Sequence, residues 1–124
     1  MSIVHIRAPG SIPLSQFARA TPPAVGAGKE APTLATLEAY AAADQTVRVG
    51  TWEASPGQFR RAVVDAEFSH FIAGHATFEC DDGQRYEFRA GDAAFFPPST
   101  KGTWTVHAAV RKTYVVFRDE AGER

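Results

Sequence analysis

Short runs of strand-forming residues, separated by turn signals, recur from Val47 to near the end of the chain. The runs read VRVGTWEA, QFRRAVV, EFSHFIAG, HATFEC, QRYEFRA, AAFFP, TWTVHA and KTYVVFR. This pattern predicts an antiparallel meander of about eight strands. Because an open sheet of this kind leaves exposed edges, we expect it to close into a barrel or a double-sheet jelly roll. Predicted helices and strands do not alternate along the chain, so a parallel α/β fold is not expected.

The chain before Val47 has a different composition, rich in proline, alanine and glycine. Residues 3–6 could form an edge strand, residues 21–28 have little tendency toward helix or sheet, and residues 33–43 (TLATLEAYAAA) predict a short helix. We therefore expect three parts, listed in chain order: an N-terminal arm and connecting segment (1–46), a β-barrel core (47–118) and a polar tail (119–124). The arm is expected to wrap around the core or to be mobile.

Size and charge exclude several classes of protein. A chain of 124 residues, 44% of them hydrophobic, can fold as one globular domain without metal or disulfide staples. Thirteen basic and fourteen acidic residues are scattered along it, so we expect neither a nucleic acid nor a membrane surface as partner. A lone cysteine and the lack of a signal peptide or long apolar run predict a soluble, cytoplasmic protein. No phosphate loop, nucleophile elbow, Cys-x-x-Cys pair or zincin motif occurs.

Two stretches match the spacing of the two cupin signatures. Glu67 is followed after six residues by Gly74, and Gly91 is followed after five residues by Pro97. The frame around them includes Gly50-Thr51-Trp52-Glu53, Pro56-Gly57-Gln58-Phe59 and Lys101-Gly102-Thr103-Trp104. Over residues 47–118 the chain thus resembles small cupins related to the ethanolamine-utilisation cupin and ureidoglycine aminohydrolase. The resemblance implies an all-β, RmlC-like jelly-roll barrel, here preceded by an irregular arm. We expect Gly74 and Gly91 to lie where strands reverse with positive φ.

The resemblance also shows where metal ligands would be, and this sequence departs from it there. Metal-binding cupins carry two histidines shortly before the glutamate of the first signature and one after the proline of the second. The matching positions hold Arg61, Val63 and Gly102, or Arg60 and Ala62 for the first pair if the gap is one residue longer. Only Glu67 is retained, and one carboxylate does not hold a transition metal. We therefore expect no metal or other cofactor, unless a divalent metal binds at a rearranged site.

The histidines of the chain lie elsewhere, at His5, His70, His75 and His107. Side chains alternate between the two faces of a strand, so His70 points out if Glu67 points in. By the same rule His107 misses the cavity if Trp104 faces it. A relocated histidine site stays open as an alternative, although we expect these histidines to be solvated or hydrogen-bonded.

Alternation groups Glu67, Trp104 and Arg61 around one cavity. An inward carboxylate needs a cationic partner or has a raised pKa, so Glu67 is either an acid, base or ligand anchor, or a structural residue paired with Arg61 or Arg60. Trp52 and Trp104 could line a pocket for a small molecule or simply fill the barrel.

Two further residues complete the predicted site. Glu53 adjoins Trp52, and Tyr114 lies on the last long strand near Lys112, which makes Glu53 and Tyr114 secondary pocket candidates. In the adjacent pair Arg111-Lys112, alternation predicts that one side chain turns inward and the other turns to solvent.

Two functions follow, and the sequence leaves open whether the protein is an enzyme. The first is metal-free binding or sensing of a small polar metabolite by Glu67, Arg61, Trp104, Trp52 and Glu53. The second is a small aminohydrolase- or epimerase-like enzyme, with Glu67 and Tyr114 as the catalytic acid and base or with a rearranged metal site. A third role, assembly through a sheet edge or the arm, is also considered, and a homodimer is expected in any case.

Overall fold

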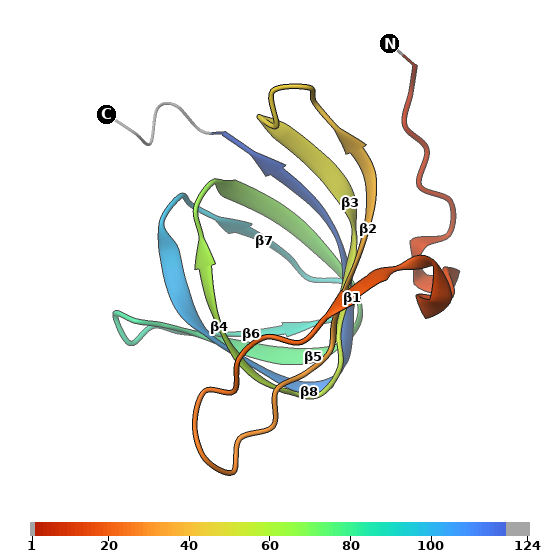
Figure 1. Ribbon diagram of the computed structural model, residues 1–124. Helices are drawn as coiled ribbons and strands as arrows, with labels where there is room; N and C mark the ends of the chain where they lie inside the picture. The colour runs from red at the N-terminus through yellow and green to blue at the C-terminus, as the bar shows by residue number, and fades with distance from the viewer. Residues whose placement is uncertain (1, 119–124) are drawn as a thin grey trace.

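Two long antiparallel strands, β5 (Ala66–Cys80) and β8 (Thr100–Phe117), lie at the centre of the sheet, and shorter strands pair with them on either side (Figure 1). The computed structural model describes residues 2–118, so the predicted polar tail lies outside the described residues. The elements are two short 3-10 helices, η1 (Pro9–Ser11) and η2 (Leu14–Gln16), and the strands β1 (Ala18–Ala20), β2 (Leu34–Ala41), β3 (Val47–Ala54), β4 (Gly57–Val63), β5 (Ala66–Cys80), β6 (Arg85–Arg89), β7 (Ala93–Phe96) and β8 (Thr100–Phe117). All strand pairs are antiparallel, as predicted.

β5 and β8 pair with each other and belong to both halves of a curled sheet. One half has the order β1-β2-β3-β8-β5-β7, and the other has the order β4-β8-β5-β6. Figure 1 shows the two halves curving around a common interior. This arrangement is the all-β jelly-roll barrel that the cupin resemblance implied, and it agrees with the closed β fold predicted from the strand-like runs.

The two halves meet where β5 and β8 bend. Register shifts interrupt the β5–β8 pairing between Phe71 and Ala76, and Gly74 at the centre of this stretch has a φ of 90°. A Cβ atom at Gly74 would overlap the carbonyl oxygen of Ala109 on β8, so only glycine lets the two backbones approach here. The sequence predicted positive φ at Gly74 correctly but placed a strand reversal there. The runs EFSHFIAG and HATFEC instead form one bent strand.

Residues 34–41 form a strand and not the predicted helix. β2 pairs with β3 along its length, from Leu34 opposite Ala54 to Ala41 opposite Arg48. The helix propensity of alanine and leucine is a weak preference, and the hydrogen-bond ladder offered by β3 outweighs it. The sheet therefore extends into the segment that was expected to lie outside the strands. Residues 3–6 form no strand, whereas residues 21–28 are irregular, as predicted.

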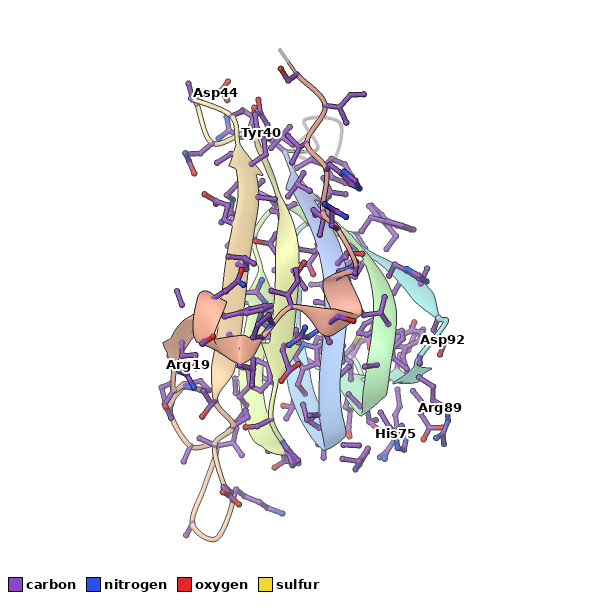
Figure 2. The ribbon with its side chains drawn as sticks, turned by 90° about the vertical axis from the view of Figure 1, so that its right-hand side faces the viewer. Arg19, Tyr40, Asp44, His75, Arg89 and Asp92 are labelled. Carbon is purple, nitrogen blue, oxygen red and sulfur yellow. The ribbon has the colours of Figure 1, made fainter. Side chains whose placement is uncertain are left out.

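The N-terminal arm lies across the outer face of the sheet (Figure 2). Arg111 on β8 donates hydrogen bonds to the carbonyl oxygens of Pro9, at 2.9 Å, and Ile12, at 2.7 Å, and its guanidinium stacks 4.9 Å from the ring centre of Phe17. These contacts explain why Arg111 is buried like its neighbour Lys112, against the prediction that one of the two is solvated. Lys112 points into the barrel, and Arg111 points outward beneath the arm.

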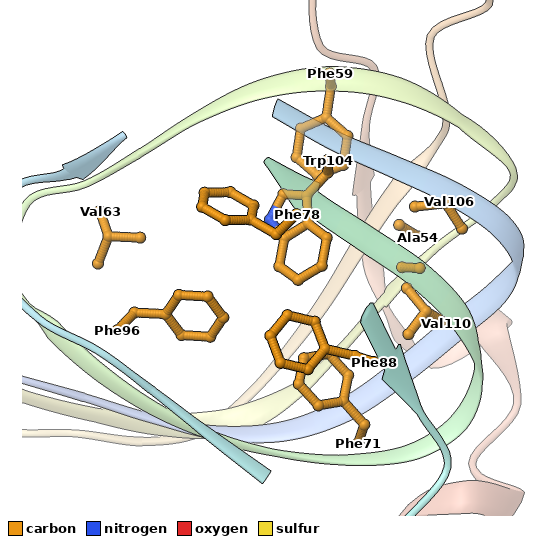
Figure 3. Packing of buried hydrophobic residues seen from close by; sticks show 11 residues of the cluster. Ala54, Phe59, Val63, Phe71, Phe78, Phe88, Phe96, Trp104, Val106 and Val110 are labelled. Carbon is orange, nitrogen blue, oxygen red and sulfur yellow. The ribbon is translucent and has the colours of Figure 1, made fainter. Parts of the chain in front are cut away.

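Aromatic side chains fill much of the barrel interior (Figure 3). Phe71 and Phe88 stack with ring centres 4.7 Å apart, and Trp104 packs against Phe78 at 4.9 Å. Each such ring buries a large apolar area, so this cluster supplies much of the stability of the fold. Trp104 and Phe59 of this cluster also line a cavity in the barrel.

Candidate functional site

A cavity of about 320 Å³ lies inside the barrel and receives side chains from β1, β2, β3, β4, β5 and β8. We call it the barrel cavity and define it by its lining residues, which are Ala18, Ala20, Leu34, Thr36, Arg48, Trp52, Phe59, Arg61, Glu67, Trp104, Lys112, Tyr114 and Val116. Most of the candidates named from the sequence meet here. Apolar rings form one wall, and charged side chains face them.

Glu67 is the central acceptor of the barrel cavity. Its side chain is inward and the residue is only 3% exposed, together with the buried Ser69 and Phe71 that alternation placed on the same face. Oε2 accepts hydrogen bonds from Lys112 Nζ, at 2.7 Å, and from Ser69 Oγ, at 2.8 Å. Oε1 lies 3.5 Å from the guanidinium of Arg61. The carboxylate thus has two cationic neighbours, and the closer one is Lys112.

Lys112 is the principal residue of the barrel cavity that was not predicted from the sequence. It is 6% exposed, and its ammonium lies 4.8 Å from the ring centre of Trp52. Three more rings, those of Phe71, Phe96 and Trp104, have centres 5.4–5.6 Å from the same nitrogen. Cation–π attraction and the Glu67 carboxylate together offset part of the cost of burying this charge. Lys112 is two residues from Tyr114 on β8, so alternation could have placed both on one face.

The ionisable groups of the barrel cavity are held in defined states. Burial opposes ionisation of Glu67, but the charge and hydrogen bond of Lys112, aided by Ser69 and Arg61, outweigh it and hold the pKa of Glu67 below its usual value. Burial lowers the pKa of Lys112, with Glu67 opposing that shift. Burial also raises the pKa of Tyr114, so its phenol stays protonated at neutral pH. At neutral pH Glu67 is therefore an ionised hydrogen-bond acceptor, and Tyr114 is a hydrogen-bond donor.

Glu53 lies apart from the other sequence candidates. Its Oε1 accepts a hydrogen bond of 2.7 Å from Arg111 Nε on the outer face of the sheet, beneath the N-terminal arm. The reason is alternation, because Trp52 turns into the barrel cavity and its neighbour must turn away. Arg61, Trp52, Trp104, Glu67 and Tyr114 all line the cavity, and Arg48 joins them without having been predicted.

The model of the EutQ-like cupin domain family matches residues 41–114, more than half of the chain. The chain belongs to this family. This EutQ-like cupin has the fold class that the resemblance implied. No protein with a curated function matches it significantly.

Solved structures share the fold of this EutQ-like cupin at low sequence identity. EutQ from Clostridium difficile aligns with a TM-score of 0.62 and 19% identity, over 70% of this chain and 69% of that one. A putative ethanolamine utilization protein Q from Salmonella typhimurium aligns with a TM-score of 0.62 and 15% identity, over 82% of this chain and 95% of that one. A protein of unknown function from Pseudomonas syringae reaches 0.67 at 22% identity, over 81% of this chain but only 43% of that chain. At these identities the likeness concerns the fold alone.

The metal-ligand positions of this EutQ-like cupin do not fit a transition metal. Val63 is apolar and packed in the core, and a Cβ atom at Gly102 would lie 2.7 Å from the Phe78 ring, which leaves no room for a histidine. The remaining carboxylate, Glu67, already faces the positive charges of Lys112 and Arg61, which would repel a cation. Within residues 2–118, no three His, Cys, Asp or Glu side chains are grouped to hold a metal ion.

None of the four histidines lines the barrel cavity, as alternation predicted for His70 and His107. His70 is exposed, and His5 belongs to the arm. His107 Nε2 lies 2.9 Å from Thr77 Oγ1, and the ring of His75 packs against it with centres 4.6 Å apart. His75 lies on β5 between Arg89 of β6 and Ala108 of β8, and Figure 2 shows it near Arg89. None of the described helices is long or apolar enough to cross a membrane.

Proposed function

We propose that this EutQ-like cupin binds a small organic anion, in particular a carboxylate-bearing metabolite, in the barrel cavity and without a metal ion. The observation that carries the proposal is the charge of the cavity lining. Three cationic side chains, Arg48, Arg61 and Lys112, face one carboxylate, Glu67, which leaves an excess of positive charge. A carboxylate ligand would balance that excess.

Arg61 is suited to recognise the anion. Its side chain is 46% exposed, and its only ion pair among the described residues is the 3.5 Å contact with Glu67. A guanidinium carries five N–H donors in a planar fork, which matches the two oxygens of a carboxylate. Trp52 and Trp104 would supply apolar walls, and a volume of about 320 Å³ suits a small metabolite.

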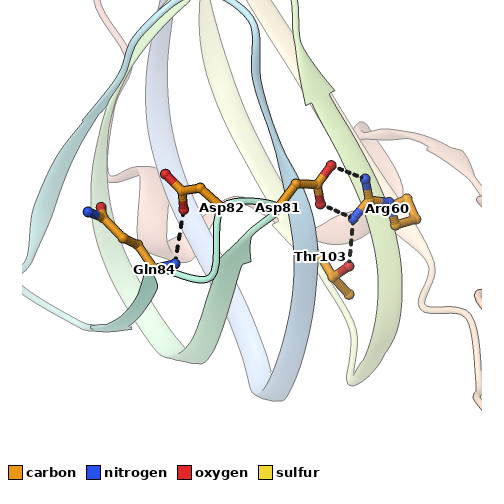
Figure 4. Close-up of polar contacts among 5 residues, drawn as sticks. All are labelled: Arg60, Asp81, Asp82, Gln84 and Thr103. Carbon is orange, nitrogen blue, oxygen red and sulfur yellow. Dashed lines mark hydrogen bonds and ion pairs between the residues drawn. The ribbon is translucent and has the colours of Figure 1, made fainter.

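A second, larger cavity of about 650 Å³ is less suited to specific binding. It lies between the β5–β6 turn and the β7–β8 connection, and its charged residues, Asp81, Asp82 and Lys101, are all exposed. Asp81 is held by Arg60 and Asp82 by the backbone of Gln84 (Figure 4). Specific pockets combine apolar walls with a few converging polar groups, and the barrel cavity has this arrangement.

The test compares Arg61→Gln with Arg60→Gln, two variants that lose the same charge at adjacent positions. Arg60 points to the outer face, where it binds Asp81 and Thr103 (Figure 4), whereas Arg61 points to the barrel cavity. Small carboxylates, amines and ureides are screened by thermal shift, and hits are measured by calorimetry. We expect carboxylates to raise Tm, and Arg61→Gln to weaken their binding about tenfold or more, since a charged hydrogen bond is worth about 1.5–3 kcal/mol. Equal effects of both variants, or no binding of any carboxylate, would refute the proposal.

The enzymatic alternative uses the same cavity and rests on one observation. Glu67 is held ionised and Tyr114 protonated, which are the opposite states that a base and an acid need at neutral pH. Conversion of a bound carboxylate that is lost in Tyr114→Phe, with binding retained, would establish it.

A further inference from the structure

The Lys112 side chain has features that its ion pair with Glu67 does not explain. The other lysines of the chain, Lys29 and Lys101, are exposed to solvent, whereas Lys112 is 6% exposed and faces the barrel cavity. A buried ion pair adds little to stability compared with apolar side chains of similar size. An amine enclosed by aromatic rings and hydrogen-bonded to a carboxylate is, in contrast, well placed for chemistry at a carbonyl group.

The surroundings of Lys112 make its ammonium easier to deprotonate than that of a lysine in water. Its nitrogen is surrounded by the rings of Trp52, Phe71, Phe96 and Trp104, which solvate a charge less well than water does. Burial lowers the pKa of Lys112 accordingly. Glu67, 2.7 Å away, is the base that can take up the released proton.

We propose that Lys112 is a nucleophile that forms an imine with a small oxo acid, a ligand that carries a carboxylate next to an aldehyde or ketone carbon. This inference rests on the proposed function for the recognition of the carboxylate. Arg61 and Lys112 contact opposite oxygens of the same Glu67 carboxylate, at 3.5 and 2.7 Å. The anion-binding group and the amine are therefore close together, which favours ligands whose carboxylate and carbonyl carbon are adjacent.

The step balances without any further reagent. Glu67 accepts a proton from the Lys112 ammonium, and the amine lone pair then attacks the carbonyl carbon while the carbonyl π electrons move to oxygen. Glu67 returns its proton to that oxygen, which gives a carbinolamine. Glu67 next takes a second proton from the nitrogen and delivers it to the hydroxyl group, which leaves as water. Ammonium and carbonyl compound thus become a protonated imine and water, and the positive charge stays beside Glu67.

The product keeps the contacts that hold Lys112 in the folded protein. A protonated imine has the same charge as the ammonium, so the ion pair with Glu67 and the attraction to the surrounding rings persist. The barrel therefore accommodates the covalent adduct without an uncompensated charge.

The experiment traps the imine chemically. The folded wild-type protein is incubated with pyruvate or glyoxylate and reduced with borohydride, which converts an imine to a stable secondary amine. Peptide mass mapping then locates the carboxyethyl or carboxymethyl group. We expect the label at Lys112, with little at Lys29 or Lys101. Label spread equally over the lysines, or absent from Lys112, would overturn the inference. This readout needs only the wild-type protein.

Variants and a second ligand separate this inference from the proposed function. We expect Lys112→Arg, which keeps the charge but cannot form an imine, to lose the label, and the control Lys29→Arg/Lys101→Arg to retain it. Lactate, which has the carboxylate but no carbonyl group, tests anion binding alone. If lactate and pyruvate both raise Tm but Lys112 is not labelled, the imine is refuted and the anion site stands. If neither binds and no label forms, both proposals are refuted.

Discussion

At the scale of single residues, the interior of the barrel is organised by one buried ion pair. Glu67 and Lys112 have 2.7 Å between their charged atoms and almost no exposure to solvent. The position of the carboxylate is the one that the cupin signature predicts, while its partner comes from the last strand. Each charge depends on the other, since removal of one partner leaves the other uncompensated in an apolar setting.

Glu67→Gln is expected to lower the free energy of unfolding by about 3–5 kcal/mol, because it leaves the Lys112 ammonium without a counter-charge. Urea unfolding measures the change. The matched control is Glu79→Gln on the same strand, where the side chain is 59% exposed and its 4.0 Å contact with Arg85 is weak. The double variant Glu67→Gln/Lys112→Met is expected to recover most of the loss. Equal stability of Glu67→Gln and Glu79→Gln would show that the pair is not coupled.

The same pair predicts a dependence of stability on pH. Because the pKa of Glu67 is lower in the folded protein than in the unfolded chain, its contribution is complete above the unfolded value of about 4.3 and is lost as pH falls through the folded value. The free energy of unfolding of the wild type should therefore fall more steeply below pH ~4.3 than that of Glu67→Gln/Lys112→Met. Urea titrations at several acidic pH values give both slopes. Parallel slopes would assign the acid sensitivity to other carboxylates.

At the scale of elements, the bend in β5 and β8 creates the barrel from a single sheet. Gly74 combines a positive φ with contact between the backbones of the two strands, whereas Gly91, in the turn between β6 and β7, has a positive φ in open space. Both were expected from the sequence to need positive φ, because glycine at turn signals is a local feature. The contact with β8 at Gly74 is not local and became visible only in the fold.

These two glycines allow the bend to be tested. Gly91→Ala introduces backbone strain alone and is expected to cost about 1–3 kcal/mol in the free energy of unfolding. Gly74→Ala adds the overlap with Ala109 and is expected to cost clearly more. Chemical denaturation compares them. Similar losses in both variants would mean that β8 yields to the added methyl group.

At the scale of the whole molecule, one arginine binds residues 9–17 of the N-terminal arm to the barrel. Arg111 binds Glu53 and two carbonyl oxygens of the arm, and stacks on Phe17. The expectation that the arm wraps the core agrees with these contacts. The homodimer stays a prediction. Light scattering after size-exclusion chromatography would measure the mass of the particle in solution.

Arg111→Met is expected to free the arm from the barrel, because it removes the donors that bind Pro9 and Ile12 while preserving most of the apolar stem. Limited proteolysis should then cut residues 2–17 faster than in the wild type, while the strands stay protected. Arg60→Met, an arginine on the outer face of β4, is the control. An unchanged cleavage rate would show that other contacts hold the arm.

Local features of the sequence determined the all-β class, the inward face around Glu67 and the absence of the family's histidine ligands. The sequence predicts which side chains of a strand point inward, because alternation is a local property of the strand. The tertiary structure decided which distant residues meet: Lys112 with Glu67, Glu53 with Arg111 beneath the arm, and β2 with β3 in place of a helix. Strand register and pairing depend on contacts between segments far apart in the chain, and these overrule weak local preferences.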